Sequence, residues 1–196
     1  MKDRLVEIAC IVDRSGSMQA ITSDAIGGFN SFLDSQKREP GSARLTLVLF
    51  DHEYEVVHDS VDIQQVPPLN ETTYQPRGTT ALLDAIGRTI DDIGKRLSGT
   101  PKDKQPGLVI VAILTDGMEN ASRDYDYDRI SKLIAHQHEK YAWEFIFLAA
   151  NQDAIASAGK LSINANDAHS YQADSPGIHA AYSRMSDAVL HKRRRS

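Results

Sequence analysis

The sequence has little of what marks secreted, membrane or nucleic-acid-binding proteins. Its 196 residues contain one cysteine, Cys10, so no internal disulfide is possible and nothing indicates an oxidising compartment. No apolar run approaches the roughly 18 residues that a membrane helix needs, and residues 1–7 do not have the pattern of a cleaved leader. We therefore expect a cytoplasmic protein outside the membrane, with Cys10 as a small core residue.

Positive charge is also in short supply. Lysine and arginine number 22 against 27 aspartate and glutamate residues, a net charge of −5. Because an acidic surface is poorly suited to phosphate backbones, nucleic acid is not the expected partner. Four of the cations lie in the last five residues, and we interpret residues 192–196 as a basic disordered tail. No linker-like stretch interrupts residues 1–191, which we take as one domain of unknown oligomeric state.

Apolar residues alternate along the chain between strand-like runs and helical spacing. Buried strands are predicted from continuous apolar runs, and helices from apolar residues that recur every three or four positions. The expected strands cover residues 5–12, 44–50, 54–57, 108–114 and 143–149, and the expected helices cover residues 22–39, 80–97, 124–137, 151–159 and 176–191.

This alternation predicts an α/β fold: a doubly wound, Rossmann-like and mostly parallel sheet with helices on both faces. Only three residues separate the strands at 44–50 and 54–57, too few for a crossover, so these two should form a hairpin with one antiparallel strand at the sheet edge. Ligands of such sheets bind beyond the carboxyl ends of the strands, which makes the residues at those ends the candidates for function.

Two predicted strands end in a carboxylate. Asp13 and Asp116 each follow an apolar run directly, and Ser15 and Ser17 follow Asp13 at steps of two, so their side chains can converge. Thr80, at the start of a predicted helix, can reach the same crevice. Each residue alone is an ordinary turn or cap residue. Together these hard oxygen donors suit Mg²⁺, Mn²⁺ or Ca²⁺ and not the softer zinc sites.

The order Asp13-x-Ser15-x-Ser17, then Thr80, then Asp116-Gly117 resembles the metal-ion-dependent adhesion site of the von Willebrand factor type A (vWA) domain. The similarity spans residues 5–189, and the stretches at 77–86 and 113–122 look most like small stand-alone intracellular members from bacteria and phages. One departure is Thr79, which stands where the family often has a second glycine. Alignment on the family pattern selects Thr80 as the ligand and leaves Thr79 as the alternative.

The resemblance implies a binding module and not an enzyme. In the family, Mg²⁺ is held by the serine and threonine hydroxyls and the aspartates, and a partner's Asp or Glu completes its coordination; Mn²⁺ or Ca²⁺ is possible here. It also implies that ligation can be coupled to a shift of the last helix, residues 176–191, although the sequence shows only one packing face.

A competing hypothesis is a metal-dependent phosphohydrolase on a similar sheet, with Asp13 as its nucleophile. That chemistry usually needs a second carboxylate two residues later, where Ser15 stands, and a cation aimed at the phosphate, whereas Arg14 would point away. Four loop residues near the site either help to read a partner or are ordinary loop residues: Tyr74, Arg77, Glu119 and Asn120.

Overall fold

The computed structural model describes residues 5–195, which build a six-stranded sheet with the spatial order β3-β2-β1-β4-β5-β6. β3 is antiparallel to β2, and the other neighbouring strands are parallel. The strands are β1 (Val6–Asp13), β2 (Ala43–Phe50), β3 (Tyr54–Asp62), β4 (Leu108–Thr115), β5 (Glu144–Ala150) and β6 (Ala168–Tyr171).

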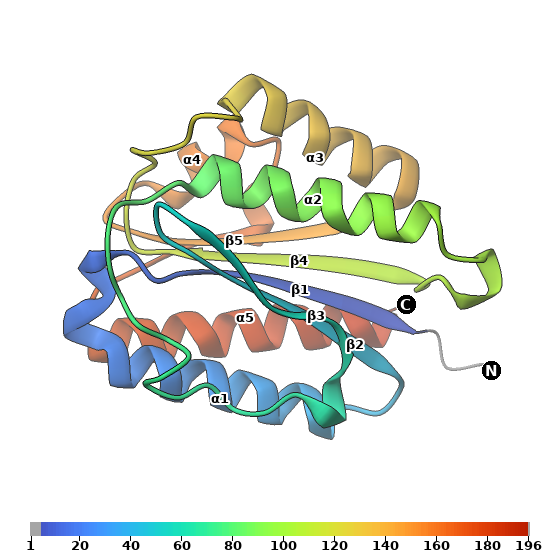
Figure 1. Ribbon diagram of the computed structural model, residues 1–196, viewed down its shortest axis with the longest axis horizontal. Helices are drawn as coiled ribbons and strands as arrows, with labels where there is room; N and C mark the ends of the chain where they lie inside the picture. The colour runs from blue at the N-terminus through green and yellow to red at the C-terminus, as the bar shows by residue number, and fades with distance from the viewer. Residues whose placement is uncertain (1–4, 196) are drawn as a thin grey trace.

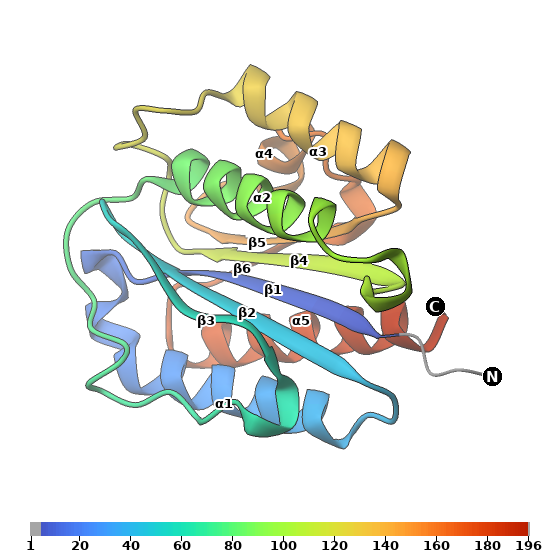
Figure 2. The same cartoon turned by 45° about the vertical axis from the view of Figure 1, so that its right-hand side comes forward.

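The predicted doubly wound architecture is confirmed. Helices α1 and α5 cover one face of the sheet, and α2, α3 and α4 cover the other (Figures 1 and 2). Every residue of β1 is buried, as expected for a parallel strand covered on both faces, and Cys10 lies in the core. The helices are α1 (Thr22–Arg38), α2 (Leu82–Ser98), α3 (Tyr127–Tyr141), α4 (Ala154–Lys160) and α5 (Ser175–Arg195).

The predicted hairpin is also confirmed, because β3 pairs antiparallel with β2 from Phe50 opposite Tyr54 onward. β3 is longer than its apolar stretch and continues to Asp62, since an edge strand can face solvent on one side and need not stay apolar. β6 was not predicted. Its four residues, Ala168–Tyr171, are too few to set up an alternating or continuous apolar pattern.

The basic tail is a correction. α5 continues to Arg195, so the disorder expected from residue 192 is wrong for residues 192–195, while Ser196 lies outside the described residues. Cations in the last turn of a helix are favoured by the helix dipole. Three of them also have partners on other elements: Lys192 with Glu144 and Asp167, Arg193 with Gln36, and Arg194 with Glu39.

The carboxyl ends of the parallel strands meet at one edge of the sheet, on the left in Figure 1. β1 and β4 are neighbours there, with Val12 opposite Leu114, so the residues that follow them lie side by side. The loop before α2 reaches the same edge. Within residues 5–195, no helix has the length and apolar character needed to cross a membrane.

Candidate metal centre

Asp116 and the two predicted serines lie at the carboxyl edge of the sheet. Asp116 follows β4 directly, and Ser15 and Ser17 lie where the chain turns from β1 into the 3-10 helix η1 (Gly16–Ile21). The Ser17 hydroxyl donates to Asp116 Oδ1 at 2.8 Å, and the Ser15 hydroxyl lies 3.4 Å from the same oxygen. The two hydroxyl oxygens are 3.1 Å apart. Three predicted ligands therefore converge on one point.

The other carboxylate oxygen of Asp116 is an exception to ordinary packing. Oδ2 is buried and accepts no hydrogen bond. Buried polar atoms are nearly always satisfied, because leaving one unpaired costs about 1–3 kcal/mol. A carboxylate oxygen held in this state beside two hydroxyls is suited to binding a cation.

Asp13, the last residue of β1, is fully buried and has both carboxylate oxygens engaged. Oδ1 accepts the Ser15 backbone N–H at 2.7 Å, and Oδ2 accepts the Thr115 hydroxyl at 2.7 Å. The Tyr74 hydroxyl donates to the Asp13 backbone carbonyl at 2.6 Å. Tyr74 is thus buried beneath the site and supports it, and does not line its rim.

The structure distinguishes the two candidate threonines. Thr80 is buried, whereas Thr79 is exposed. The Thr80 hydroxyl faces Gly117, since a Cβ added to Gly117 would lie 3.5 Å from the Thr80 hydroxyl oxygen. The loop that carries them is fixed against the β1 loop, since the Gly16 N–H donates to the Gly78 carbonyl at 3.1 Å. The geometry therefore favours Thr80, as the alignment predicted. Thr80 precedes α2, which begins at Leu82 and not at residue 80.

The environment of Asp13 and Asp116 disfavours their ionised forms. Burial, and then the negative charge of Asp116, raise the pKa of Asp13 above its ordinary range. Burial likewise raises the pKa of Asp116. Neither has an ion-pair partner among residues 5–195. The ionised pair is therefore disfavoured in the protein alone, and a bound cation would relieve that cost.

Two of the four loop residues singled out near the site, Glu119 and Asn120, hold the start of α2. Glu119 accepts the Leu83 N–H at 2.9 Å, and Asn120 Oδ1 accepts the Thr80 N–H at 2.9 Å. The Glu119 bond satisfies a donor in the first turn of α2 that has no partner within the helix. The Asn120 bond fixes Thr80 relative to the loop after β4.

Sequence reasoning missed three residues that support the site. The Thr115 hydroxyl donates to Asp13, and the loop after β5 holds the end of β4: Asn151 Nδ2 donates to the Asp116 carbonyl at 2.6 Å, and Gln152 Nε2 to the Gly117 carbonyl at 3.0 Å. Asn151 adopts a left-handed φ of 58°, and α4 begins at Ala154 after its cap Asp153, not at residue 151 as predicted. No spacing rule predicts such contacts, because they join segments distant in the sequence.

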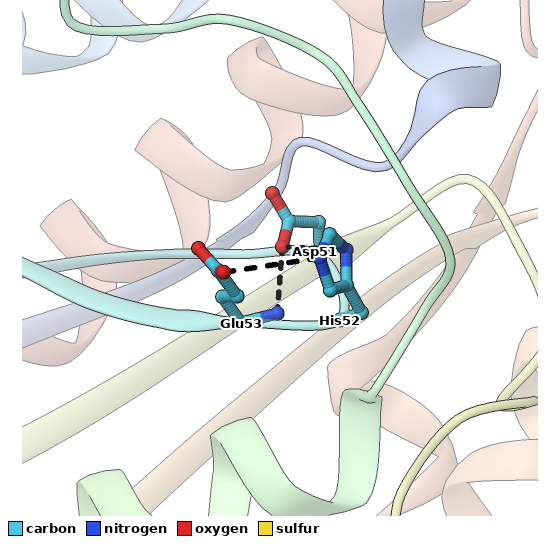
Figure 3. A group of neighbouring side chains, drawn as sticks. All are labelled: Asp51, His52 and Glu53. Atoms are coloured by element: carbon cyan, nitrogen blue, oxygen red, sulfur yellow. Dashed lines mark hydrogen bonds and ion pairs between the residues drawn. The ribbon is translucent and has the colours of Figure 1, made fainter.

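A second acidic group lies at the same edge, in the turn between β2 and β3. Asp51, His52 and Glu53 point toward one another in Figure 3, with potential ligand atoms within 4.8 Å. Asp51 Oδ1 accepts the Glu53 N–H at 2.6 Å, and Oδ2 accepts both Arg14 Nε at 3.0 Å and Arg77 Nε at 2.9 Å. This carboxylate is already satisfied by two guanidinium groups, so the Asp51 group is a structural ion-pair cluster.

The five predicted residues fit a divalent cation. All offer hard oxygen donors, one of these oxygens is buried without a partner, and two buried carboxylates lack a compensating charge. The members of the set are Asp13, Ser15, Ser17, Thr80 and Asp116.

No protein-family model and no curated protein matches the sequence. Solved structures do match. One is proximal thread matrix protein 1 from the mussel byssus with a zinc-occupied MIDAS (metal-ion-dependent adhesion site) motif: 16% identity, TM-score 0.60, 94% of this chain and 46% of that chain. Another is a von Willebrand factor type A structure from Catenulispora acidiphila: 14% identity, TM-score 0.60, 95% of this chain and 43% of that chain.

A third match is the manganese-loaded TRAP protein of Plasmodium vivax: 20% identity, TM-score 0.53, 78% of this chain and 59% of that chain. The chain thus spans less than half the length of the mussel and Catenulispora structures. At these identities the likeness shows the fold, and it agrees with the observed strand order and helix layers. The chain has the fold of a von Willebrand factor type A domain, as the resemblance of its sequence predicted.

Proposed function

We propose that this chain is a metal-dependent protein-binding module that grips an Asp or Glu side chain of a partner protein through a bound divalent cation. The observation that carries the proposal is the buried, unpartnered Oδ2 of Asp116, next to a second carboxylate, Asp13, that has no cationic partner. Oxygens of Asp13, Ser15, Ser17, Thr80 and Asp116 would hold the ion.

We propose Mg²⁺ as the ion, with Mn²⁺ or Ca²⁺ as alternatives. The donor set favours a hard cation, and two carboxylates with three hydroxyls are too few to enclose it, so at least one position stays open to an outside oxygen. Two structures with this fold are described as zinc-occupied or manganese-loaded, which supports a divalent ion in general. When bound, the ion supplies an electrophilic position for an incoming carboxylate.

We propose binding and not catalysis as the activity. Asp13, the nucleophile of the competing phosphohydrolase hypothesis, is fully buried, and each of its carboxylate oxygens accepts a short hydrogen bond. Arg14 is paired with Asp51 and Glu55 and is not aimed at the site. Both observations argue against phosphoryl transfer. As partner we propose a cytoplasmic protein, and not a nucleic acid or a membrane, in keeping with the acidic charge.

The test is a thermal unfolding series in chelator and then in Mg²⁺, Mn²⁺ and Ca²⁺. Metal at about 100 times its dissociation constant should add roughly 2.7 kcal/mol to the unfolding free energy, a rise in Tm on the order of 5 to 10 °C. The increment should disappear in Asp116→Asn and in Asp13→Ala. The matched control is Glu53→Gln, which changes an acidic residue at the same sheet edge and should keep the full increment.

Equal increments in the wild type and in Asp116→Asn would place the ion elsewhere and overturn the proposal. An increment lost in Glu53→Gln but kept in Asp116→Asn would assign the ion to the Asp51 group. Hydrolysis of an aryl phosphate that requires both Mg²⁺ and Asp13 would instead support the enzyme.

A further inference from the structure

The exposed apolar side chains are unevenly distributed around the candidate metal centre. Among residues 5–195, five large apolar side chains are exposed, and three of them lie in the segments that follow β4 and β5: Met118 in the loop after β4, Tyr127 at the first residue of α3, and Ile155 in α4. Met118 is 66% exposed, Ile155 56% and Tyr127 40%. We call these three residues the apolar flank. Single exposed apolar residues are common, but several gathered beside a binding site mark a contact surface.

Two residues of the apolar flank, Met118 and Ile155, are joined to the site through hydrogen bonds of Gln152. Met118 lies two residues after Asp116, in the loop that Gln152 holds by donating to the Gly117 carbonyl at 3.0 Å. Gln152 in turn accepts the Ser157 hydroxyl at 2.7 Å, which ties this loop to α4, the helix that carries Ile155. Met118 and Ile155 are therefore presented from one connected support on the β5 side of the metal centre.

The opposite side of the metal centre has a different character. There the half-exposed side chains are charged or polar: His52, Glu53 and Arg77. Arg77 already pairs with Glu53 and Asp51, and His52 lies 3.3 Å from Asp51. Covering this side with an apolar group would take paired charges out of water without a new partner, which is unfavourable.

We infer that the partner carries an apolar side chain directly beside its acidic residue, and that this side chain packs on the apolar flank of Met118, Tyr127 and Ile155. This inference rests on the proposed function, since the acidic residue must be held at the metal for its neighbour to reach the flank. One dication beside Asp13 and Asp116 balances the formal charge of these two carboxylates, and the three flank residues are themselves uncharged, so this side suits an uncharged neighbour better than the charged side does. The inferred binding motif is thus an acidic residue next to a leucine, isoleucine, methionine or phenylalanine.

The probe is a set of glycine- and serine-based octapeptides with one central glutamate, differing in a single residue next to it: Leu, Phe, Ser, Lys or Asp. Peptides are presented densely on a surface, in Mg²⁺ and in chelator, and the dissociation constants of those that bind are measured by fluorescence anisotropy. We expect Mg²⁺-dependent binding that is about tenfold tighter for Leu or Phe than for Ser, which corresponds to about 1.4 kcal/mol.

The variant that tests the flank is Met118→Ser with Ile155→Ser. Both residues are exposed, so the fold should be kept, and neither is a proposed ligand. We expect this double variant to lose the preference for Leu and Phe and to keep its Mg²⁺ increment in Tm. The matched control is Val56→Ser with Tyr141→Ser, which removes the other two exposed large apolar side chains among residues 5–195 and should bind like the wild type.

The inference would be overturned if the Met118/Ile155 variant kept the wild-type preference for Leu or Phe over Ser. It would also be overturned if the wild type bound all the peptides equally well. If no peptide binds in Mg²⁺ although Tm still responds to the ion, the inferred motif is wrong while the metal centre stands. If Tm does not respond either, the proposed function itself has failed.

Discussion

Two acidic groups lie at the same edge of the sheet and differ in what balances their charge. Asp51 is buried, yet it accepts bonds from two arginines and a backbone N–H, and its pKa lies below the ordinary value. Asp13 and Asp116 are also buried, have no cationic partner, and have raised pKa values. Closely spaced acidic residues are therefore insufficient to indicate a metal site, and the decisive feature is charge that the protein leaves uncompensated.

The contrast predicts that removing the charge of Asp51 lowers the unfolding free energy without metal, whereas removing the charge of Asp116 does not. The largest effect is expected at Asp51. Asp51→Ala leaves the buried Arg14 with only the half-exposed Glu55, and breaking a buried pair in this way should cost about 3 kcal/mol of unfolding free energy. Urea unfolding in chelator measures this loss. The metal increment in Tm should survive, and a cost below about 1 kcal/mol would mean that the arginines do not depend on this carboxylate.

Acid should remove the same stabilisation. Burial pushes the pKa of Asp51 upward, but the Glu53 N–H, the Arg77 bond and the charges of Arg14 and Arg77 outweigh it and hold the pKa below 3.8. A depressed pKa contributes stability above the unfolded value that is lost as the pH falls through the folded value. The difference in unfolding free energy between the wild type and Asp51→Ala, measured by urea unfolding in chelator, should be constant from pH 7 to about pH 5. It should become smaller below pH 3.8. A gap that widens in acid would contradict this account.

Gly78→Ala should disturb the loop that carries Thr80, which lies between the Asp51 group and the candidate metal centre. Gly78 has a φ of +66°, and an added Cβ would clash with His52 Nδ1. We therefore expect a loss of about 2 kcal/mol in unfolding free energy, and a smaller metal increment in Tm as the Thr80 loop moves. The matched control is Gly41→Ala, with φ +95° and no atom within 4 Å of the new Cβ, which should show the conformational cost alone. Equal losses in the two variants would refute the steric part of the argument.

Asp116→Asn should have the opposite sign from Asp51→Ala when no metal is present. The raised pKa of Asp116 means that its ionised form opposes folding at pH 7, so a neutral side chain of the same shape should leave stability unchanged or raise it by up to about 1 kcal/mol in chelator. In Mg²⁺ the order should reverse, because only the wild type gains the increment. Destabilisation of this variant in chelator by more than 1 kcal/mol would show that the carboxylate is structural.

The comparison of the two acidic groups also shows what the sequence can and cannot predict. The fold was predictable because long apolar runs specify buried strands and three residues specify a hairpin. The positions of Asp13 and Asp116 followed from the rule that parallel strands end at one edge. Thr80 was selected over Thr79 by alignment, and its burial now supports that choice.

The remaining features depend on contacts between distant segments. Nothing in the sequence pairs Arg14 with Asp51, or Thr115 with Asp13, because no local pattern encodes a bond across 37 or 102 positions. The prediction of a disordered tail from residue 192 was wrong for the same reason, since α5 continues to Arg195. A run of cations resembles a solvated tail until the fold places Glu144 and Asp167 beside Lys192.

The smallest effect is expected where the charges are exposed. The Glu53 side chain is 59% exposed and that of its partner Arg77 is 51% exposed, so water screens their attraction and ordering two flexible side chains offsets most of it. Glu53→Gln should therefore leave urea unfolding unchanged within the scatter of the measurement. Added salt should not create a difference in unfolding free energy between the wild type and Glu53→Gln, since a pair this weak has little attraction for salt to screen. If Glu53→Gln instead destabilised the chain as much as Asp51→Ala, then Asp51, Glu53 and the two arginines would act as one unit, and the buried contacts of Asp51 alone would no longer account for the stability of the cluster.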